Sequence, residues 1–244
     1  MMDRAVFDRM AETDQDHWWF EARRDILDTF LVRKAALPAD ARILEVGAGT
    51  GHNFPMLEKH GRVDAVELDA PARALASQRL GREVIDAALP ELTGIDDDAY
   101  EMVALLDVLE HVEDDRAALE GLQRVVKPGG LLLLTVPAYQ WMWSHHDEAH
   151  HHFRRYNRAR LDALASAHGW RRRHSSYFNS HLFPPIAAAR LLGKVTKNES
   201  ADDAVPPGPV NGLLRMVFGA EQAWVGRVPM PFGVSILGLY ESVG

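Results

Sequence analysis

Three glycines directly after a short apolar run give the first sign of a ligand site in this chain. The segment reads LEVGAGTG over residues 44–51, and the run ARILEV at 41–46 leads into it. Glycines between a buried strand and a helix let the backbone approach a ligand closely and expose amide donors. Glu67 lies 16 residues beyond Gly51, at the end of the next apolar run, where a carboxylate can accept both hydroxyls of a ribose. The simpler alternative is a tight turn with an acid on a neighbouring loop.

The glycine spacing also narrows the class of ligand. A dinucleotide site is expected to show G-x-G-x-x-G, whereas this segment shows G-x-G-x-G, and His52 takes the place of the third glycine. The difference argues against NAD and against a tightly seated pyrophosphate. An NAD-dependent oxidoreductase therefore stays as a disfavoured alternative.

Asp107 and His111 are candidates for acid–base chemistry. They are four residues apart, so they share one face if the segment is helical, and the carboxylate can then orient the imidazole as a general base. The alternative is that Asp107 only caps a helix and His111 packs over the ligand.

A second polar cluster is YQWMWSHHDEAHHHFRRY, residues 139–156. Its histidines and acids suggest a metal site, but adjacent histidines on a loop specify no ligand geometry, and we expect no metal. A loop that leaves the carboxyl end of a strand in an open α/β sheet lies where ligands bind. We therefore expect four polar residues to line the substrate pocket: Asp147, His151, Arg155 and Tyr156. The alternative is a hydrogen-bonded lid.

The elements that must position these residues alternate between apolar strands and amphipathic helices. Strands are predicted at 41–46, 62–68, 82–85, 100–106, 129–136, 170–178 and 234–240. Helices are predicted at 19–36, 52–60, 71–80, 114–126, 158–168, 182–195 and 210–226, with a polar loop at 196–209. This alternation predicts a parallel sheet with helices on both faces.

At this point the sequence resembles the class I S-adenosylmethionine-dependent methyltransferases over about residues 40–180 and the final strand. The motifs that carry the resemblance are LEVGAGTG (44–51), AVELDAPA (65–72), IDAA (85–88), LLDVLEHVEDD (105–115) and RVVKPGGLLLLTVP (124–137). The family's fold is a Rossmann-like, doubly wound seven-stranded α/β sheet, mostly parallel with an antiparallel last strand. Around it we expect an N-terminal helical lid and a helical insertion before the last strand.

The resemblance implies S-adenosylmethionine as cofactor and a set of residues that hold it. In the family pattern Glu67 binds the ribose, Asp86 accepts the adenine amine and Ala87 offers a backbone donor. The full set is Trp19, Arg23, Glu45, Gly47, Ala48, Gly49, Asn53, Glu67, Leu68, Asp86, Ala87, Leu106 and Asp107. The catalytic candidates are Asp107, His111, His151 and Tyr156. Trp19 and Arg23 belong to HWWFEARR (17–24), which forms either an aromatic lid over the sulfonium or ordinary core.

Composition excludes several function classes. The chain has 244 residues, a net charge of −8 and no cysteine, so disulfides, thiolate metal sites and a cysteine nucleophile are absent. The acidic balance argues against a nucleic-acid partner. Because no long apolar stretch is present, we expect neither a signal peptide nor a transmembrane segment, and hence a cytoplasmic protein.

Three parts are expected: a helical lid at 1–38, a core at 39–180 and 233–244, and a helical insertion at 181–232. The apolar helices of the insertion must be buried against the core, where they would cap the acceptor pocket, or against a second copy in a homodimer, a long apolar substrate or a membrane surface. An arginine-rich segment at 150–174 is suited to an anionic or lipid-linked acceptor. The predicted function is methyl transfer to a small molecule, with oxygen slightly favoured over nitrogen, and a non-catalytic cofactor-binding module is the alternative.

Overall fold

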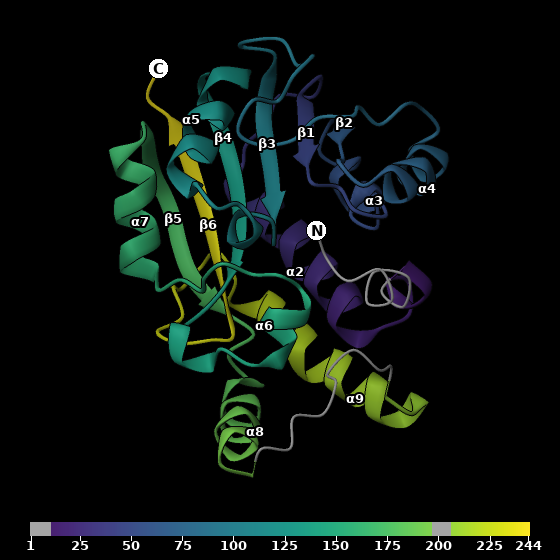
Figure 1. The fold of residues 1–244 in the computed structure, drawn as a ribbon, viewed down its shortest axis with the longest axis vertical. Helices are drawn as coiled ribbons and strands as arrows, with labels where there is room; N and C mark the ends of the chain where they lie inside the picture. The colour runs from purple at the N-terminus through teal and green to yellow at the C-terminus, as the bar shows by residue number, and fades with distance from the viewer. Residues whose placement is uncertain (1–10, 197–205) are drawn as a thin grey trace.

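A computed structural model describes residues 11–196 and 206–244, which form a six-stranded mixed sheet between layers of helices (Figure 1). The strands are β1 Arg42–Val46, β2 Arg62–Val66, β3 Tyr100–Leu106, β4 Val126–Pro137, β5 Trp170–Phe178 and β6 Ser235–Ser242. Their order is β2-β1-β3-β4-β6-β5. Neighbours from β2 to β4 are parallel, and β6 runs antiparallel to both β4 and β5. The predicted, mostly parallel sheet with a reversed last strand is confirmed.

The expected strand at 82–85 is reduced to one parallel bridge, between Val66 and Ile85. Only Val84 and Ile85 are apolar in this segment, and no pairing is recorded for 86–88 in the described chain. The run is therefore too short to extend the ladder along β2. The sheet of the described residues has six strands where seven were expected.

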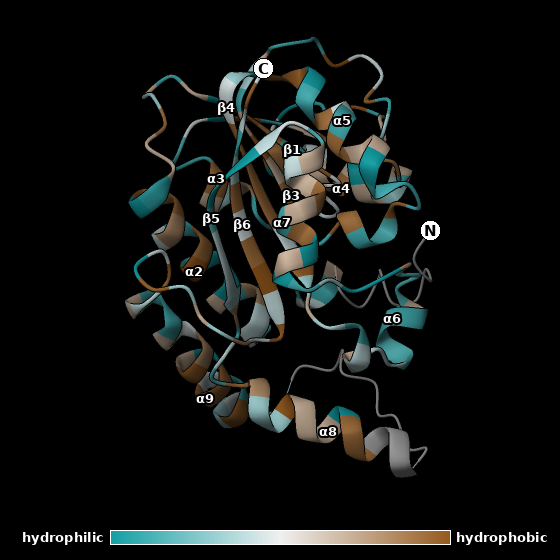
Figure 2. Ribbon diagram, turned by 90° about the vertical axis from the view of Figure 1, so that its left-hand side faces the viewer, coloured by the Kyte–Doolittle hydropathy of each residue, from teal (hydrophilic) through white to brown (hydrophobic). Residues whose placement is uncertain are grey.

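Helices cover both faces of the sheet, because side chains along each strand alternate between two cores. In β3, Met102 and Ala104 pack with α2 (Trp18–Lys34), α4 (Ala70–Leu80) and α9 (Gly208–Gly219). Val103 and Leu105 face the other way, toward α5 (Asp115–Val125) and α7 (Arg158–Ala167). The brown, apolar strands at the centre of Figure 2 lie between these two layers.

Two short helices differ from the prediction. The helix expected at 52–60 is only α3 (Phe54–Leu57), because the following residues turn into β2. Within the histidine-rich segment, α6 (His145–Ala149) forms where a loop was expected, since Ser144 and Asp147 make a reciprocal capping box. The remaining short turns are the 3₁₀ segments η1 (Leu109–His111), η2 (Gln140–Met142) and η3 (Ala220–Ala223).

The insertion before β6 contains α8 (Phe183–Thr196) and α9, and α9 packs on α2. Asn211 Oδ1 accepts a hydrogen bond from Trp18 N at 2.9 Å, and its Nδ2 donates to Asp16 O at 2.9 Å. Farther along α2, Arg33 Nη1 donates to Val225 O at 2.8 Å. The polar loop expected at 196–209 lies mostly outside the described residues.

Large apolar side chains remain exposed on the outer surfaces of the two insertion helices: Leu191, Leu192, Leu213 and Met216. Across residues 11–196 and 206–244, no helix has the length and apolar character that a bilayer crossing requires. The boundaries of the three predicted parts stay predictions.

Candidate functional site

The glycine loop after β1 has one open position. Gly47, Gly49 and Gly51 have φ values of +69°, +56° and +78°, which favour glycine. A Cβ at Gly47 would lie 2.7 Å from Val108 Cγ2, and one at Gly51 would lie 2.3 Å from Phe54 Cε2. At Gly49 a Cβ would meet no described atom within 4 Å. Gly49 is therefore where a ligand can come against the backbone.

The loop amides are used differently from the expectation. Gly47 N and Ala48 N donate to Val66 O at 3.0 and 3.1 Å, and Gly49 N donates to Glu67 Oε2 at 2.7 Å. These amides tie the loop to the end of β2 rather than pointing at a ligand, because the loop closes directly over the neighbouring strand. The structure therefore shows close approach at Gly49 and partners for these three amides, and the assignment of Gly47, Ala48 and Gly49 to the cofactor stays a prediction.

Glu67 sits at the end of β2 as the spacing predicts. Its Oε1 also accepts from Asp69 N at 2.8 Å, and burial raises the pKa of its carboxyl. Each carboxylate oxygen has a further lone pair, so hydroxyl donors can still bind. Leu68, beside it, is exposed.

A buried polar network joins α2 to β1, β3 and β4 beneath the loop. Asn53 Nδ2 donates to Glu45 Oε1 at 2.7 Å, and Arg23 Nη1 lies 3.5 Å from Asn53 Oδ1. Arg23 Nη2 donates to Asp107 Oδ2 at 2.6 Å and to Thr135 Oγ1 at 2.8 Å. Four of the predicted cofactor residues are thus brought together, and Thr135 is a partner that the sequence did not indicate.

One carboxylate oxygen of Glu45 accepts no hydrogen bond from the described residues. The side chain is 1% exposed, and its Oε2 has no hydrogen-bond partner among the described residues. Burial raises the pKa of Glu45 to about 8. A bound cation with N–H donors, such as an ammonium group, would satisfy this oxygen and favour its ionised form.

The segment before α2 closes over the glycine loop. Asp14 is fully buried; the Thr50 hydroxyl donates to its carboxylate, and Arg79 Nη1 donates to its Oδ2 at 2.6 Å. Arg24 Nη1 donates to the Asp14 carbonyl at 2.9 Å. Sequence reasoning missed Asp14 because it lies in a polar stretch without any motif.

Aromatic rings of the N-terminal segment also lie near the glycine loop. The Arg23 guanidinium lies 5.0 Å from the Trp19 ring centroid, and the Phe20 and His52 rings are 4.9 Å apart. Burial, together with the nearby Arg23, lowers the pKa of His52 to about 3, so this imidazole is neutral. The aromatic segment therefore packs against the loop beside the buried network.

The predicted adenine-side residues lie beyond β2. Asp86 is exposed and pairs with Arg73 Nη2 at 3.0 Å, and Ala87 is buried. Arg73 Nη1 also donates to the carbonyls of Glu67 and Leu68 at 2.9 and 3.0 Å. Arg73 thus connects Asp86 with the end of β2.

Asp107 does not orient His111 in the way the spacing predicted. Asp107 has φ of +56°, and the helix needed for an i, i+4 pair is only the three-residue turn η1. Asp107, which follows the buried Leu106, binds Arg23, and the His111 ring is hydrogen-bonded by the backbone of His150. Burial and the neighbouring His152 and His150 lower the pKa of His111 to about 3.

The other two catalytic candidates differ in burial. Tyr156 is buried in the core, where its hydroxyl donates to Asp115 Oδ2 at 2.9 Å, and His151 is exposed with φ of +55°. Instead the His152 ring lies 4.6 Å from that of His111. The histidine-rich segment reaches the site through His152.

The arginine-rich segment is largely paired with carboxylates. Five of its arginines have acidic partners within 3.1 Å: Arg154 with Asp115, Arg155 with Asp147, Arg172 with Asp162, and both Arg171 and Arg173 with Glu241. The positive charge available for an anionic acceptor is therefore smaller than the sequence suggested.

The sequence profile of the family described as "Methyltransferase domain" matches residues 15–183. The chain is 29% identical over 136 residues to the demethylmenaquinone methyltransferase of Clavibacter sepedonicus, covering 53% of this chain and 56% of that protein. It is 29% identical over 100 residues to a ubiquinone biosynthesis O-methyltransferase of Alkalilimnicola ehrlichii, covering 38% of this chain and 40% of that protein.

Among solved structures, a SAM-dependent methyltransferase from Archaeoglobus fulgidus superposes with a TM-score of 0.60 at 12% identity, covering 94% of this chain and 97% of that chain. At this identity the likeness concerns the fold alone. The chain spans about half the length of the curated relatives that it matches.

Proposed function

The chain belongs to the methyltransferase domain family, and from this premise we propose that it transfers the methyl group of S-adenosylmethionine to a small-molecule acceptor. Two features of the glycine loop carry the proposal: the buried Oε2 of Glu45, which has no partner among the described residues, and the open position at Gly49. An amino acid ammonium would complete the hydrogen bonding of that carboxylate, and the nearby Glu67 can accept ribose hydroxyls.

The residues proposed to hold the cofactor form three groups. Glu45, Asn53, Arg23 and Asp107 form the buried network, and we assign it the amino acid end. The ribose would be held by the loop and the end of β2, through Gly47, Ala48, Gly49, Glu67 and Leu68. The adenine would be held by Asp86, Ala87 and Leu106. The sulfonium would be covered by Trp19.

When bound, S-adenosylmethionine supplies a methyl group already activated by the sulfonium sulfur. The protein's own task is to align the acceptor in line with that group and to exclude water. Asp14 and Arg23 fix the N-terminal segment over the site, which serves both purposes. His111 is neutral at physiological pH, and its low pKa makes it a poor proton acceptor, so we propose that it is placed beside the acceptor and is not the general base.

For the acceptor we propose an oxygen atom of a small, lipid-linked molecule. Two relatives are named for methylation in quinone chemistry, one of them as an O-methyltransferase. The exposed apolar side chains of α8 and α9 suit an acceptor with an apolar tail. Nitrogen acceptors are the second candidate.

The test is transfer of labelled methyl from S-adenosylmethionine into a lipid and metabolite extract by the purified full chain. We expect the acceptor to carry the label and S-adenosylhomocysteine to be released without it. Calorimetry should show saturable binding of the cofactor. Gly49→Val should abolish binding, because a β-branched residue is strained at this φ and fills the open position. Gly94→Val is the matched control, since Gly94 also has a positive φ (+82°) and an open Cβ position but lies in the loop before β3, at the opposite end of the sheet.

Absence of cofactor binding by the unmodified chain would refute the proposal. Binding without label transfer to any extract would instead favour the non-catalytic binding module.

A further inference from the structure

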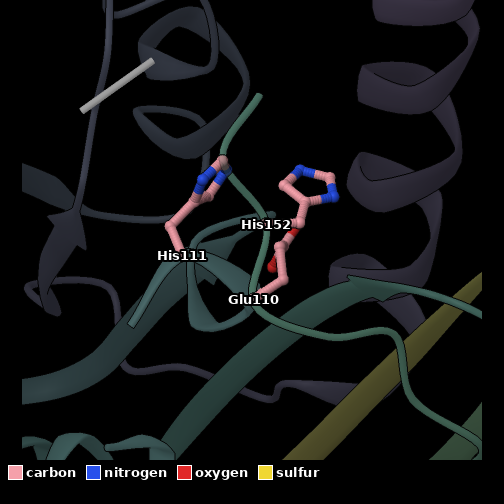
Figure 3. Close-up of side chains that lie close together, drawn as sticks. All are labelled: Glu110, His111 and His152. Atoms are coloured by element: carbon pink, nitrogen blue, oxygen red, sulfur yellow. The ribbon is translucent and has the colours of Figure 1, made fainter. Parts of the chain in front are cut away.

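Three metal-ligating side chains from two segments meet beside the proposed site. Glu110 and His111 lie in η1 after β3, and His152 follows α6. One potential ligand atom from each residue lies within 4.8 Å of the others. Figure 3 shows both imidazoles close together above the Glu110 side chain. We refer to Glu110, His111 and His152 as the Glu110 cluster.

Each imidazole of the cluster already has a second partner that fixes it. His152 Nδ1 is 2.9 Å from Asp147 Oδ1, and the backbone of His150 hydrogen-bonds the His111 ring. A ring that donates one N–H to a carboxylate or carbonyl keeps the lone pair of its other nitrogen for a ligand. This arrangement is typical of metal-bound histidines.

Asp147 is itself held rigidly. It is fully buried, and it accepts from Arg155 Nε at 2.7 Å, Arg155 Nη2 at 3.0 Å and Ser144 N at 2.9 Å. Hydrogen bonds from His152, Arg155 and Ser144 N keep the pKa of the Asp147 carboxyl well below its usual range. A charged, immobile carboxylate behind His152 orients the imidazole.

Glu110 supplies an unsatisfied acceptor. Its side chain is 1% exposed, and Oε2 lacks a hydrogen-bond partner within the part of the chain that the structure describes. A buried carboxylate oxygen without a donor is costly unless a proton or a cation satisfies it. The Glu110 carbonyl accepts from Phe153 N at 2.8 Å, so the backbone already joins the two segments of the cluster.

We propose that Glu110, His111 and His152 bind a divalent transition metal ion, with Asp147 as a positioning residue. Two imidazoles and one carboxylate suit Zn²⁺, Co²⁺ or Fe²⁺ better than Mg²⁺ or Ca²⁺, which prefer oxygen ligands. Three protein ligands leave coordination positions open for an oxygen or nitrogen donor of a bound molecule. The charge of Asp107, in the proposed cofactor network, acts on Glu110, so the ion would lie next to that network.

The test is a titration of the full chain, stripped with a chelator, with Co²⁺, followed by visible d–d absorption and by calorimetry. We expect one ion per chain. Glu110→Gln and His111→Ala should each weaken binding at least about tenfold, and Asp147→Asn by about 10–100-fold. His145→Ala is the matched control and should leave binding unchanged, because His145 is an exposed histidine of the same segment.

Two outcomes would overturn the proposal: no Co²⁺ binding, or equal binding by the unmodified chain and Glu110→Gln, which would mean that exposed histidines hold the ion. Glu110→Gln is nearly isosteric, so it tests the site even if Asp147→Asn fails to fold. S-adenosylhomocysteine binding, measured on each variant, separates failure of the metal site from failure of the proposed function.

Discussion

Glu45→Gln should separate the stability of the protein from its affinity for the cofactor. Glu45 is buried, and its pKa is raised from an ordinary 4.5 to about 8, so at neutral pH the folded protein holds a proton that the unfolded chain releases. For an acid with a raised pKa, stability falls as the pH rises from the unfolded value to the folded value. Glutamine has the same shape, keeps an acceptor for Asn53 and does not titrate.

The size of the effect follows from the pKa difference. Each pH unit in that window corresponds to about 1.4 kcal/mol, so the Glu45 carboxyl costs the unmodified chain about 3–4 kcal/mol of unfolding free energy between about pH 5 and pH 8. The unpaired N–H groups of the glutamine lower the unfolding free energy by the same amount at pH 5 and at pH 8, so they cancel in the comparison. The stability of Glu45→Gln relative to the unmodified chain should therefore increase by that amount across the window.

Urea unfolding of the cofactor-free chain at several pH values measures this difference. S-adenosylhomocysteine carries the same ammonium, and its affinity, from calorimetry at pH 8, should fall about tenfold or more in Glu45→Gln because a charge-assisted hydrogen bond is lost. Parallel pH profiles of stability for the two proteins would show that Glu45 is not the titrating group.

Two further predictions concern the positions of α2 and the insertion. Arg23→Met should lower the unfolding free energy by about 2–3 kcal/mol, because Asp107 and Thr135 lose their donor, and should weaken S-adenosylhomocysteine binding. Arg23→Lys keeps the charge and should recover part of the stability, measured by urea unfolding, and part of the affinity, measured by calorimetry. Glu221→Ala should lower stability by about 3 kcal/mol in thermal or urea unfolding, because this buried carboxylate accepts from three backbone amides at 179–181. A loss below about 1 kcal/mol would mean that water replaces the carboxylate.

Much of the sheet was predictable because its strands are apolar runs bounded by turn residues. The strand at 100–106 was predicted with the bounds that the structure shows, and 170–178 likewise. The weak segment at 82–85 failed because pairing beyond one bridge needs more apolar residues than it has. The helix α6 could not be read from periodicity, because the Ser144–Asp147 capping box and the ion pair with Arg155 stabilise it.

The candidate site also contains residues that the sequence indicated and residues that it did not. Glu67 was indicated by its spacing from the glycine loop, which is a local property of the sequence, and Glu45 was implied by the resemblance of LEVGAGTG to the family motif. Asp14 and Thr135 were not, since their partners lie 36 and 112 residues away along the chain. The pairing expected between Asp107 and His111 assumed a helix that the backbone at Asp107 does not form.

The contact between α2 and α9 has a consequence for how the protein is made. Trp18 and Asn211, which join these helices, are 193 residues apart in sequence. During synthesis α2 can pack on the sheet earlier, but its contact with α9 must wait until Asn211 has left the ribosome. Arg23, on the same helix, binds Asp107 and Thr135, which are made before the insertion, so the buried polar network can form before α9 packs on α2.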